Sequence, residues 1–280
     1  MKILRLKLND TFRSLPKGFE IHFLREWEFE NYDQFNPYCL AGLNGSGKSN
    51  VLEALAAIFY HIEAIHLSVK PAEFEPNPET NSKGFDSRVC TPNAFELEYL
   101  IPDDQTKKRS PVMNYYKGQL LAHIRIVKEK GKAPKVLHNP SFPDLLDGEE
   151  LDGIQIKSYL PAFILGYSSG HNEILSLPFL KMRFIHFDEY CHHLRESTVY
   201  AGSPEGRMIY LDEQYSQAIL LCHYLFPPEA IQKVFSERIK IEKITQFRII
   251  IRRCQRIELS EQRRKMMTRE ERENSFLTHP

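Results

Sequence analysis

The sequence predicts an α/β fold in which an antiparallel β-subdomain leads into a strand, a glycine-rich loop and a long helix. Three observations support this prediction. Polar and apolar residues alternate over residues 2–8 and 19–24, as expected for strands with one buried face. A glycine-rich segment, residues 42–49, lies between an apolar run and a stretch with helical spacing. Alternation returns between residues 94 and 137, which favours a further β-hairpin region.

The glycine-rich segment reads Gly42-Leu43-Asn44-Gly45-Ser46-Gly47-Lys48-Ser49 and fits the phosphate-binding (Walker A) pattern G-x-x-x-x-G-K-[ST] at every fixed position. Glycines let the backbone curl so that successive N–H groups point at phosphate oxygens. The lysine of the pattern reaches the β- and γ-phosphates, and the serine hydroxyl holds Mg²⁺. We therefore expect ATP and Mg²⁺ as cofactors, with contacts from Gly42, Asn44, Gly45, Ser46, Gly47, Lys48, Ser49 and Asn50.

The flanking residues predict the structural context that this loop needs. The apolar run Pro37–Ala41 predicts a strand before the loop, and the apolar spacing after it predicts a helix over residues 49–67. Further along the chain we expect, in order, a loop insertion over about 68–92, strands at 95–101 and 120–127, a solvated hairpin tip at 128–132, a buried strand within 159–166, a helix over 212–225 and a strand region over 239–251.

Composition limits the class of protein. Of the 280 residues, 42% are hydrophobic and 26% are charged, which is ordinary for a soluble globular chain with a real core. The five widely spaced cysteines contain no C-x-x-C pair, which suits reduced thiols. We see neither a signal peptide nor an apolar run of membrane-spanning length, so we expect a cytoplasmic location and no membrane partner.

Charge is unevenly distributed although the net charge is zero. Residues 231–273 hold 13 Lys or Arg and 7 Asp or Glu, so this region is basic. Its arginines favour either contact with nucleic-acid phosphate or a solvated surface, and the interruption by Glu258 and Glu261 favours the surface. The candidate phosphate contacts are Arg252, Arg253, Arg256, Arg263 and Arg264.

The N-terminal order of two strands, then strand, phosphate loop and helix, resembles the ABC-type ATPases. The string Asn44-Gly45-Ser46-Gly47-Lys48-Ser49-Asn50 is similar to the loop of their chromosome-structure, recombination-repair and defence branch, over about the first 60 residues. This resemblance implies heads that dimerise with nucleotide sandwiched between them, as a homodimer or a hetero-oligomer. It also implies a fold with a P-loop NTPase (ABC-ATPase-like) core.

A second string, Tyr167-Ser168-Ser169-Gly170-His171-Asn172-Glu173, looks like the ABC signature L-S-G-G-Q/E with substitutions at three positions. The resemblance implies that Ser168, Ser169 and Gly170 cap the γ-phosphate bound by a second head. The alternative is a Ser/Gly-rich helix cap in which Asn172 and Glu173 open a helix.

The wider string from Gly166 to Lys181 also resembles the restriction-system-associated, AAA-family ATPases of bacterial defence, as do Phe187–Tyr190 and Tyr210–Glu213. That resemblance implies a defence or DNA-related complex, with a nuclease or other effector subunit as partner. Members of this family are about twice as long, so we expect an N-terminal part of such a head or a subunit that a partner completes.

Hydrolysis requires a Walker B motif, in which Asp supports Mg²⁺ and Glu positions the attacking water. Two pairs are candidates. Asp188 and Glu189 follow the apolar run 184–187 at a spacing near that of ABC heads, with Asp188 as the Mg²⁺ ligand. The second pair, Asp212 and Glu213, follows a cleaner run but lies farther from Ser169. Glu189 and Glu213 are therefore alternative catalytic residues, and a third possibility is that the true motif is absent from this chain.

These elements predict an ATPase lobe over residues 1–225, including the loop insertion at about 68–92 and the hairpin region at 94–137. A strand-containing extension over 226–259 and a charged, disordered tail over 260–280 are expected to follow. The expected activity is ATP hydrolysis. The alternative is a sensor or interaction subunit that binds nucleotide without turnover, and a small-molecule kinase is a third interpretation, which the preceding hairpin disfavours.

Overall fold

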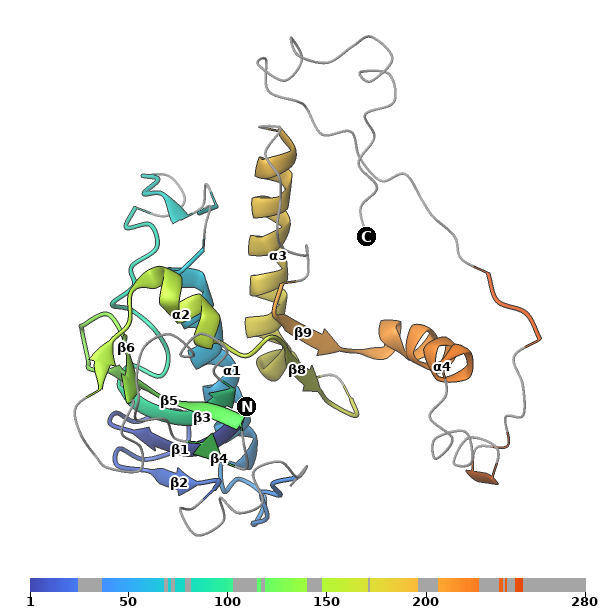
Figure 1. Cartoon of the computed structure of the whole chain (residues 1–280), viewed down its shortest axis with the longest axis horizontal. Coiled ribbons are helices and arrows are strands. Elements are labelled where there is room, and N and C mark those ends of the chain that lie inside the picture. Colours follow the sequence, from blue (N-terminus) through green and yellow to red (C-terminus); the bar gives the residue numbers. More distant parts are fainter. Residues whose placement is uncertain are drawn as a thin grey trace.

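An antiparallel sheet forms the largest element of the fold (Figure 1). The computed structural model describes residues 1–24, 37–67, 70–71, 74–78, 82–102, 115–116, 119–139, 148–170, 172–195, 206–226, 237–238, 240 and 245–248. The strand order is β2-β1-β3-β5-β6-β7, and β4 pairs with β5. These strands are β1 (Lys2–Leu8), β2 (Glu20–His22), β3 (Phe95–Pro102), β4 (Tyr115–Tyr116), β5 (Gln119–Lys128), β6 (Lys135–Asn139) and β7 (Glu149–Glu150).

Alternate residues of a strand point to opposite faces of a sheet, and on one face of this sheet these residues are apolar. Leu6 and Leu8 of β1 and Phe95 and Leu97 of β3 are fully buried there. Helix α1 (Lys48–Ile65) buries ten residues, and its apolar ones join the same core cluster. The short helix α2 (Gly153–Tyr159) adds to this cluster and is fixed by a hydrogen bond from the Tyr99 hydroxyl to the Tyr159 carbonyl at 3.0 Å. The core therefore lies between the sheet and these helices.

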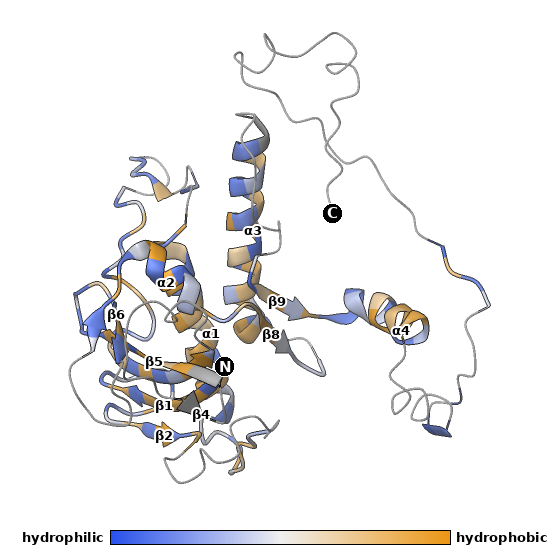
Figure 2. Ribbon diagram, in the orientation of Figure 1, coloured by the Kyte–Doolittle hydropathy of each residue, from blue (hydrophilic) through white to orange (hydrophobic). Residues whose placement is uncertain are grey.

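A second, parallel unit follows along the chain. Strand β8 (Ile164–Tyr167), helix α3 (Glu173–Arg195) and strand β9 (Met208–Leu211) form a β–α–β unit, and β8 pairs with β9 in register Ile164↔Met208. A 3₁₀ turn, η4 (Glu213–Tyr215), and helix α4 (Ser216–Leu225) come next. In Figures 1 and 2, α4 lies apart from the large sheet and displays several apolar residues.

Helix α3 packs beside α1, and both begin at the lower end of Figure 1 and run upward. Their contact includes His186 of α3 and Glu63 near the end of α1, whose Nε2 and Oε1 atoms lie 3.8 Å apart. The two helices therefore run in the same direction, and their N-terminal ends lie at the same end of the pair.

Several predicted elements are confirmed, and three predictions are wrong. Strands β1, β2, β3 and β5, helix α1 and the helical segment η4–α4 lie where the sequence patterns predict them. The strand expected within 159–166 is shorter, because α2 extends to Tyr159 and β8 begins at Ile164. The expected disordered tail at 260–280 and most of the expected strand region at 239–251 lie outside the described residues.

The strand predicted at Pro37–Ala41 does not form. Residues 37–39 are exposed, and Pro37 has no N–H with which to enter a ladder. Tyr38 instead packs on Phe23, with ring centroids 4.9 Å apart, and its hydroxyl donates to the His22 carbonyl at 3.1 Å. Side-chain contacts therefore hold this segment near β2.

The other two incorrect predictions concern the environment of Lys128 and the secondary structure of residues 184–187. Lys128, predicted to lie in a solvated tip, is 1% exposed at the end of β5. Its ammonium donates to the carbonyls of Arg88, Asn93 and Glu129 at 2.9–3.2 Å, which satisfies the buried charge. The run 184–187, predicted as a strand, belongs to α3, because Phe179, Met182 and Ile185 recur at helical spacing against the core.

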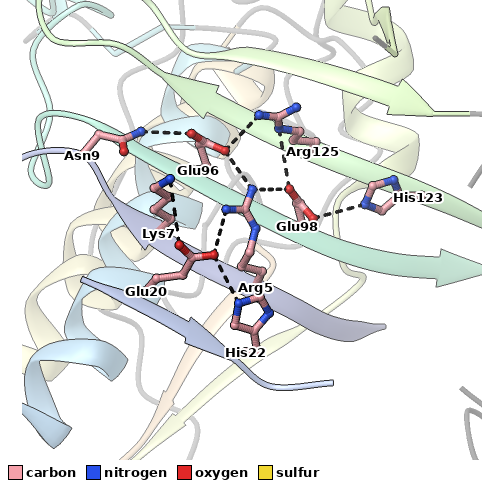
Figure 3. Close-up of polar contacts among 9 residues, drawn as sticks. All are labelled: Arg5, Lys7, Asn9, Glu20, His22, Glu96, Glu98, His123 and Arg125. Carbon is pink, nitrogen blue, oxygen red and sulfur yellow. Dashed lines mark hydrogen bonds and ion pairs between the residues drawn. The ribbon is translucent and has the colours of Figure 1, made fainter. Parts of the chain in front are cut away.

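Ion pairs cross the outer face of the large sheet (Figure 3). Arg5 on β1 donates to Glu96 at 2.8 Å and to Glu98 at 2.5 Å, both on β3. Arg125 on β5 also donates to Glu96, at 2.9 Å. The Glu98 side chain is 13% exposed, and its other oxygen lies 3.7 Å from Nε2 of His123. Burial alone would raise the pKa of Glu98, but these contacts outweigh burial and lower that pKa to about 2.

This network predicts that acid destabilises the fold through Glu98. Because the pKa of Glu98 is lower in the folded chain than its ordinary value of 4.5, its stabilisation is present above that value and is lost as pH falls toward about 2. Urea unfolding of the wild type should show a drop in the free energy of unfolding between about pH 4.5 and pH 2.5, and the drop should be smaller in Glu98→Gln. Equal drops in both proteins would contradict the assignment, and Glu149→Gln, at an exposed position, serves as the control.

Candidate nucleotide-binding site

The glycine-rich loop, residues 42–47, leads directly into α1, as the Walker A pattern requires. Helix α1 begins at Lys48, and Gly47 caps it with φ of 91°, a left-handed value that favours glycine. Gly45 has φ of 80° for the same turn. The first turn of α1, all of which the structure describes, contains no acidic residue. The positive end of an 18-residue helix therefore faces the loop, together with first-turn N–H groups that lack a carbonyl partner within the helix, and this arrangement favours an anion.

Lys48 closes the loop on itself. Its Nζ donates to the carbonyls of Gly42 and Leu43, both at 2.8 Å. Residues 41–46 are exposed, so the loop is open to a ligand from solvent. The ammonium thus lies across the loop backbone, where a phosphate oxygen can replace the carbonyls as its hydrogen-bond acceptor. Ser49 is exposed one residue later, at the start of α1, where its hydroxyl is available for a cation bound with phosphate.

The turn after β1 supports the loop from the side. An ideal Cβ on Gly47 would lie 2.6 Å from Cδ2 of Leu15, which is buried in the core. Asn50 donates from its side-chain amide to the hydroxyl of Ser14 at 2.8 Å. Arg13, with φ of 54°, donates from Nε and Nη2 to one oxygen of Glu53 at 3.1 and 2.8 Å. These contacts fix the first two turns of α1 against the turn after β1.

The sequence patterns identify Asn50 as a loop residue but give no signal for Arg13, Ser14 or Glu53. Contacts between segments some 35–40 positions apart depend on how β1 and α1 pack together, which no local pattern encodes. Only the glycine at position 47 hints at a close neighbour, since a glycine often marks a close approach of other atoms.

The carboxyl ends of β8 and β9 form the second part of the site. The two strands are parallel, and the register Tyr167↔Leu211 places the residues that follow each strand at the same edge. A cavity of about 470 Å³ opens there. It is lined by hydroxyl, amide and carboxylate groups together with apolar side chains, namely Tyr167, Ser168, Ser169, Gly170, Asn172, Glu173, Ser176, Leu180, Tyr210, Asp212, Glu213, Gln214 and Ser216.

This cavity joins two motifs that are far apart in the sequence, the signature-like string at 167–173 and the acidic pair at 212–213. Ser168, Ser169 and Gly170 are expected to act on a second head, and Glu213 is one of the two alternative catalytic residues, in the pair that lies farther from Ser169. The structure brings all four to one cavity of one chain. Asp212 accepts from the Gln214 N–H at 2.9 Å and so caps η4, while Glu213 is exposed at the strand end. The arrangement strand, Asp, Glu required of a Walker B motif is thus present at 208–213, and its catalytic use stays a prediction.

The chain that follows the loop 168–170 caps the start of α3. Asn172 accepts the Leu175 N–H on its side-chain oxygen at 3.1 Å, and the Ser176 N–H bonds to the Asn172 carbonyl at 3.0 Å. These bonds match the helix-cap alternative. They leave the predicted contact of this loop with a γ-phosphate untested, and His171 of the same string lies outside the described residues.

The first acidic pair does not lie at a strand end. Asp188 and Glu189 belong to α3, and Glu189 is 6% exposed with Oε2 at 3.3 Å from Nδ1 of His186. His186 contacts Glu63, which follows Ser49 by 14 positions on α1, or about 21 Å at the helical rise. Asp188 therefore cannot share a magnesium ion with Ser49. The Walker B interpretation of residues 184–189 is corrected by this geometry, and we assign neither residue to the site.

Glu63, His186 and Arg207 form a buried contact that joins α1, α3 and the start of β9. Arg207 Nε lies 3.4 Å from Glu63, and its other nitrogens donate to the Lys157 and Pro161 carbonyls at 3.1 and 3.2 Å. The residue before it, Gly206, has φ of 63° and leaves no room for a Cβ beside the His186 ring. These charged side chains thus hold α1 and α3 together.

Among the described residues, no group of three or more His, Cys, Asp or Glu side chains is arranged to hold a metal ion. The described helices likewise include none with the length and apolar character to cross a bilayer. No protein-family model matches the chain, and no curated protein matches it significantly.

Because Leu15 lies so close to Gly47, we expect a methyl group at position 47 to lower the free energy of unfolding. Gly47→Ala should destabilise the fold by about 2–4 kcal/mol, because left-handed strain adds to a clash with a buried leucine. Gly18→Ala is the matched control, since Gly18 has φ of 85° but nothing within 4 Å of an added Cβ, so only the strain of about 1–2 kcal/mol remains. Urea unfolding measures both. Equal losses would show that Leu15 does not confine the loop.

Proposed function

We propose that this chain binds ATP with Mg²⁺ through residues 42–49 and hydrolyses it as an ATPase lobe of the ABC-like type. The observation that carries the proposal is the loop itself. It combines left-handed glycines, a lysine lying across the loop backbone and the start of a long helix whose first turn holds no acidic residue. These features favour a phosphate anion, and adenosine as the remainder of the ligand follows from the resemblance alone.

The proposed roles are divided between the two parts of the site. Backbone N–H groups of the loop and the Lys48 ammonium bind phosphate oxygens, and the Ser49 hydroxyl holds the magnesium ion, which neutralises phosphate charge when bound. Glu213 positions or deprotonates the attacking water, with Asp212 beside it. In support, the N-terminal ends of α1 and α3 lie at the same end of the helix pair, so the loop and the cavity residues Asn172 and Glu173 lie at that end.

A nucleotide-binding sensor without turnover is the second candidate. One observation favours it: the segment 37–41 before the loop is not a strand, so within the described residues the parallel sheet consists of β8 and β9 only. An ATPase core of the proposed type needs the loop strand in that sheet to fix the nucleotide against Glu213. A second head or a partner subunit would then have to complete the site.

The oligomeric arrangement and the biological role that we propose follow from the resemblance to the ABC-type ATPases alone. We propose nucleotide-dependent pairing of heads, as a homodimer or with a related subunit, with Ser168, Ser169 and Gly170 at the γ-phosphate of the partner head. A cytoplasmic defence or DNA-related complex with a nuclease or other effector subunit, and contact with nucleic acid, belong to the same proposal.

Substitution of Lys48 tests ATP binding. Lys48→Ala should weaken binding of Mg²⁺–ATP by at least about tenfold in isothermal calorimetry, because a charged hydrogen-bond donor to phosphate is lost. Lys83→Ala, at an exposed position outside the loop, should bind like the wild type. Wild-type affinity in Lys48→Ala would contradict the assignment of the loop.

Steady-state phosphate release by the same proteins separates the two candidate functions. In an ATPase, Glu213→Gln should bind ATP normally and lose turnover by about 100-fold or more, whereas Glu189→Gln should keep turnover in the protein that remains folded. Binding without phosphate release in the wild type would favour the sensor. Turnover that survives Glu213→Gln would overturn the role of that residue.

A further inference from the structure

An apolar stripe is exposed along α3. Leu177 is 48%, Leu180 40% and Phe184 68% exposed. Their spacing of three and four positions places them on one side of the helix, while Phe179, Met182 and Ile185 are buried in the core on another. Leu180 also lines the cavity at the ends of β8 and β9. Single exposed leucines are ordinary, but a continuous stripe that runs into a cavity favours a binding surface.

The cavity that adjoins the stripe is acidic. Glu173, Asp212 and Glu213 contribute carboxylates to its wall, and none of the described residues that line it is a lysine, an arginine or a histidine. The hydroxyl of Tyr210, which also lines it, is buried and has no hydrogen-bond partner. Such a cavity attracts cationic groups. An occupant that matches both parts must combine basic and apolar side chains.

Residues 248–265 have this combination. Residues 248–265 hold seven basic and two acidic residues, and they include the apolar residues Ile257 and Leu259 between two groups of arginines. Residues 249–265 lie outside the described residues, whereas residues 245–248 are described and exposed. The 17 residues 249–265 can extend by up to about 56 Å. This reach exceeds the length of α3, about 35 Å for 23 residues.

We propose that residues 249–265 bind the acidic cavity and the apolar stripe of α3 in the same chain. Arginines of the segment pair with Glu173 and Glu213, and Ile257 and Leu259 cover Leu177, Leu180 and Phe184. Charge complementarity selects this segment over an uncharged occupant, and attachment to the same chain gives it a high effective concentration. ATP binding is assigned to residues 42–49, none of which lines this cavity, so failure of the contact would not bear on ATP binding.

Limited trypsin digestion of the full chain, followed by mass spectrometry, tests the contact. Cleavage after Arg252, Arg253, Arg256, Arg263 and Arg264 should be slowed in the wild type. The double variant Glu173→Gln with Glu213→Gln should be cleaved there at least about fivefold faster, as should the wild type in about 0.5 M salt, which screens ion pairs. Cleavage after Arg88, an exposed site outside the segment, serves as the internal reference.

Substitutions of the same kind away from the cavity serve as the control. Glu75→Gln with Glu149→Gln, at exposed positions away from the cavity, should leave cleavage of the segment unchanged. Equal cleavage rates in the wild type and the cavity variant would overturn the proposal. Protection that grows with protein concentration would overturn the intramolecular contact and assign the surface to a second copy.

Hydrogen–deuterium exchange provides a readout that does not depend on tryptic sites. In the full chain, replacing Arg252, Arg253 and Arg256 with Gln should increase exchange in peptides that cover residues 165–180, with no change in peptides from β3 and β5. Exchange over 165–180 that matches the wild type would overturn the proposal, and unchanged β3 and β5 peptides show that the variant is folded.

Discussion

The packing of α1 on the large sheet determines where the glycine-rich loop and α3 lie. Ala54, Ile58 and Ile62 of this helix are fully buried, facing Leu6, Leu97 and other side chains of β1 and β3. Each large apolar side chain contributes about 1.5–3 kcal/mol when it leaves water, so the position of the helix is strongly determined. The N-terminal end of α1 remains exposed at the glycine-rich loop. Helix α1 also positions α3, through the buried contact between Glu63 and His186.

The N-terminal strands have a role at the loop as well as in the core. The turn after β1 holds Leu15 against Gly47 and Ser14 against Asn50, so the loop rests on the β-subdomain. Preorganisation of this kind lowers the cost of ordering a loop when a ligand binds. The Arg13–Glu53 pair also keeps a carboxylate on the second turn of α1 neutralised, so that this charge does not oppose an anion at the helix N-terminus.

Sequence reasoning predicted the local parts of this structure and missed those set by distant contacts. The loop, α1 and strands β1, β3 and β5 each carry a period or a motif that local physics explains. The joining of Ser168 with Glu213 depends on the register between β8 and β9, whose partners lie 44 positions apart, and no local pattern reports a register.

The assignment of Asp188 and Glu189 failed for a related reason. An apolar run followed by Asp and Glu fits a strand end, but it fits a buried helix equally well when the run is short. Burial decided between the two, since Met182, Ile185 and Glu189 recur on the face of α3 that packs into the core. The family resemblance suggested a role for this pair and gave no information about its packing.

A crystal structure of the chain with Mg²⁺ and a non-hydrolysable ATP analogue directly tests whether residues 42–49 bind the nucleotide. We expect the β-phosphate within residues 42–49, with the Lys48 ammonium moved from the carbonyls of Gly42 and Leu43 to phosphate oxygens and α1 unmoved on the sheet. A nucleotide bound elsewhere, or Lys48 still bonded to those carbonyls with the loop empty at saturating analogue, would contradict it.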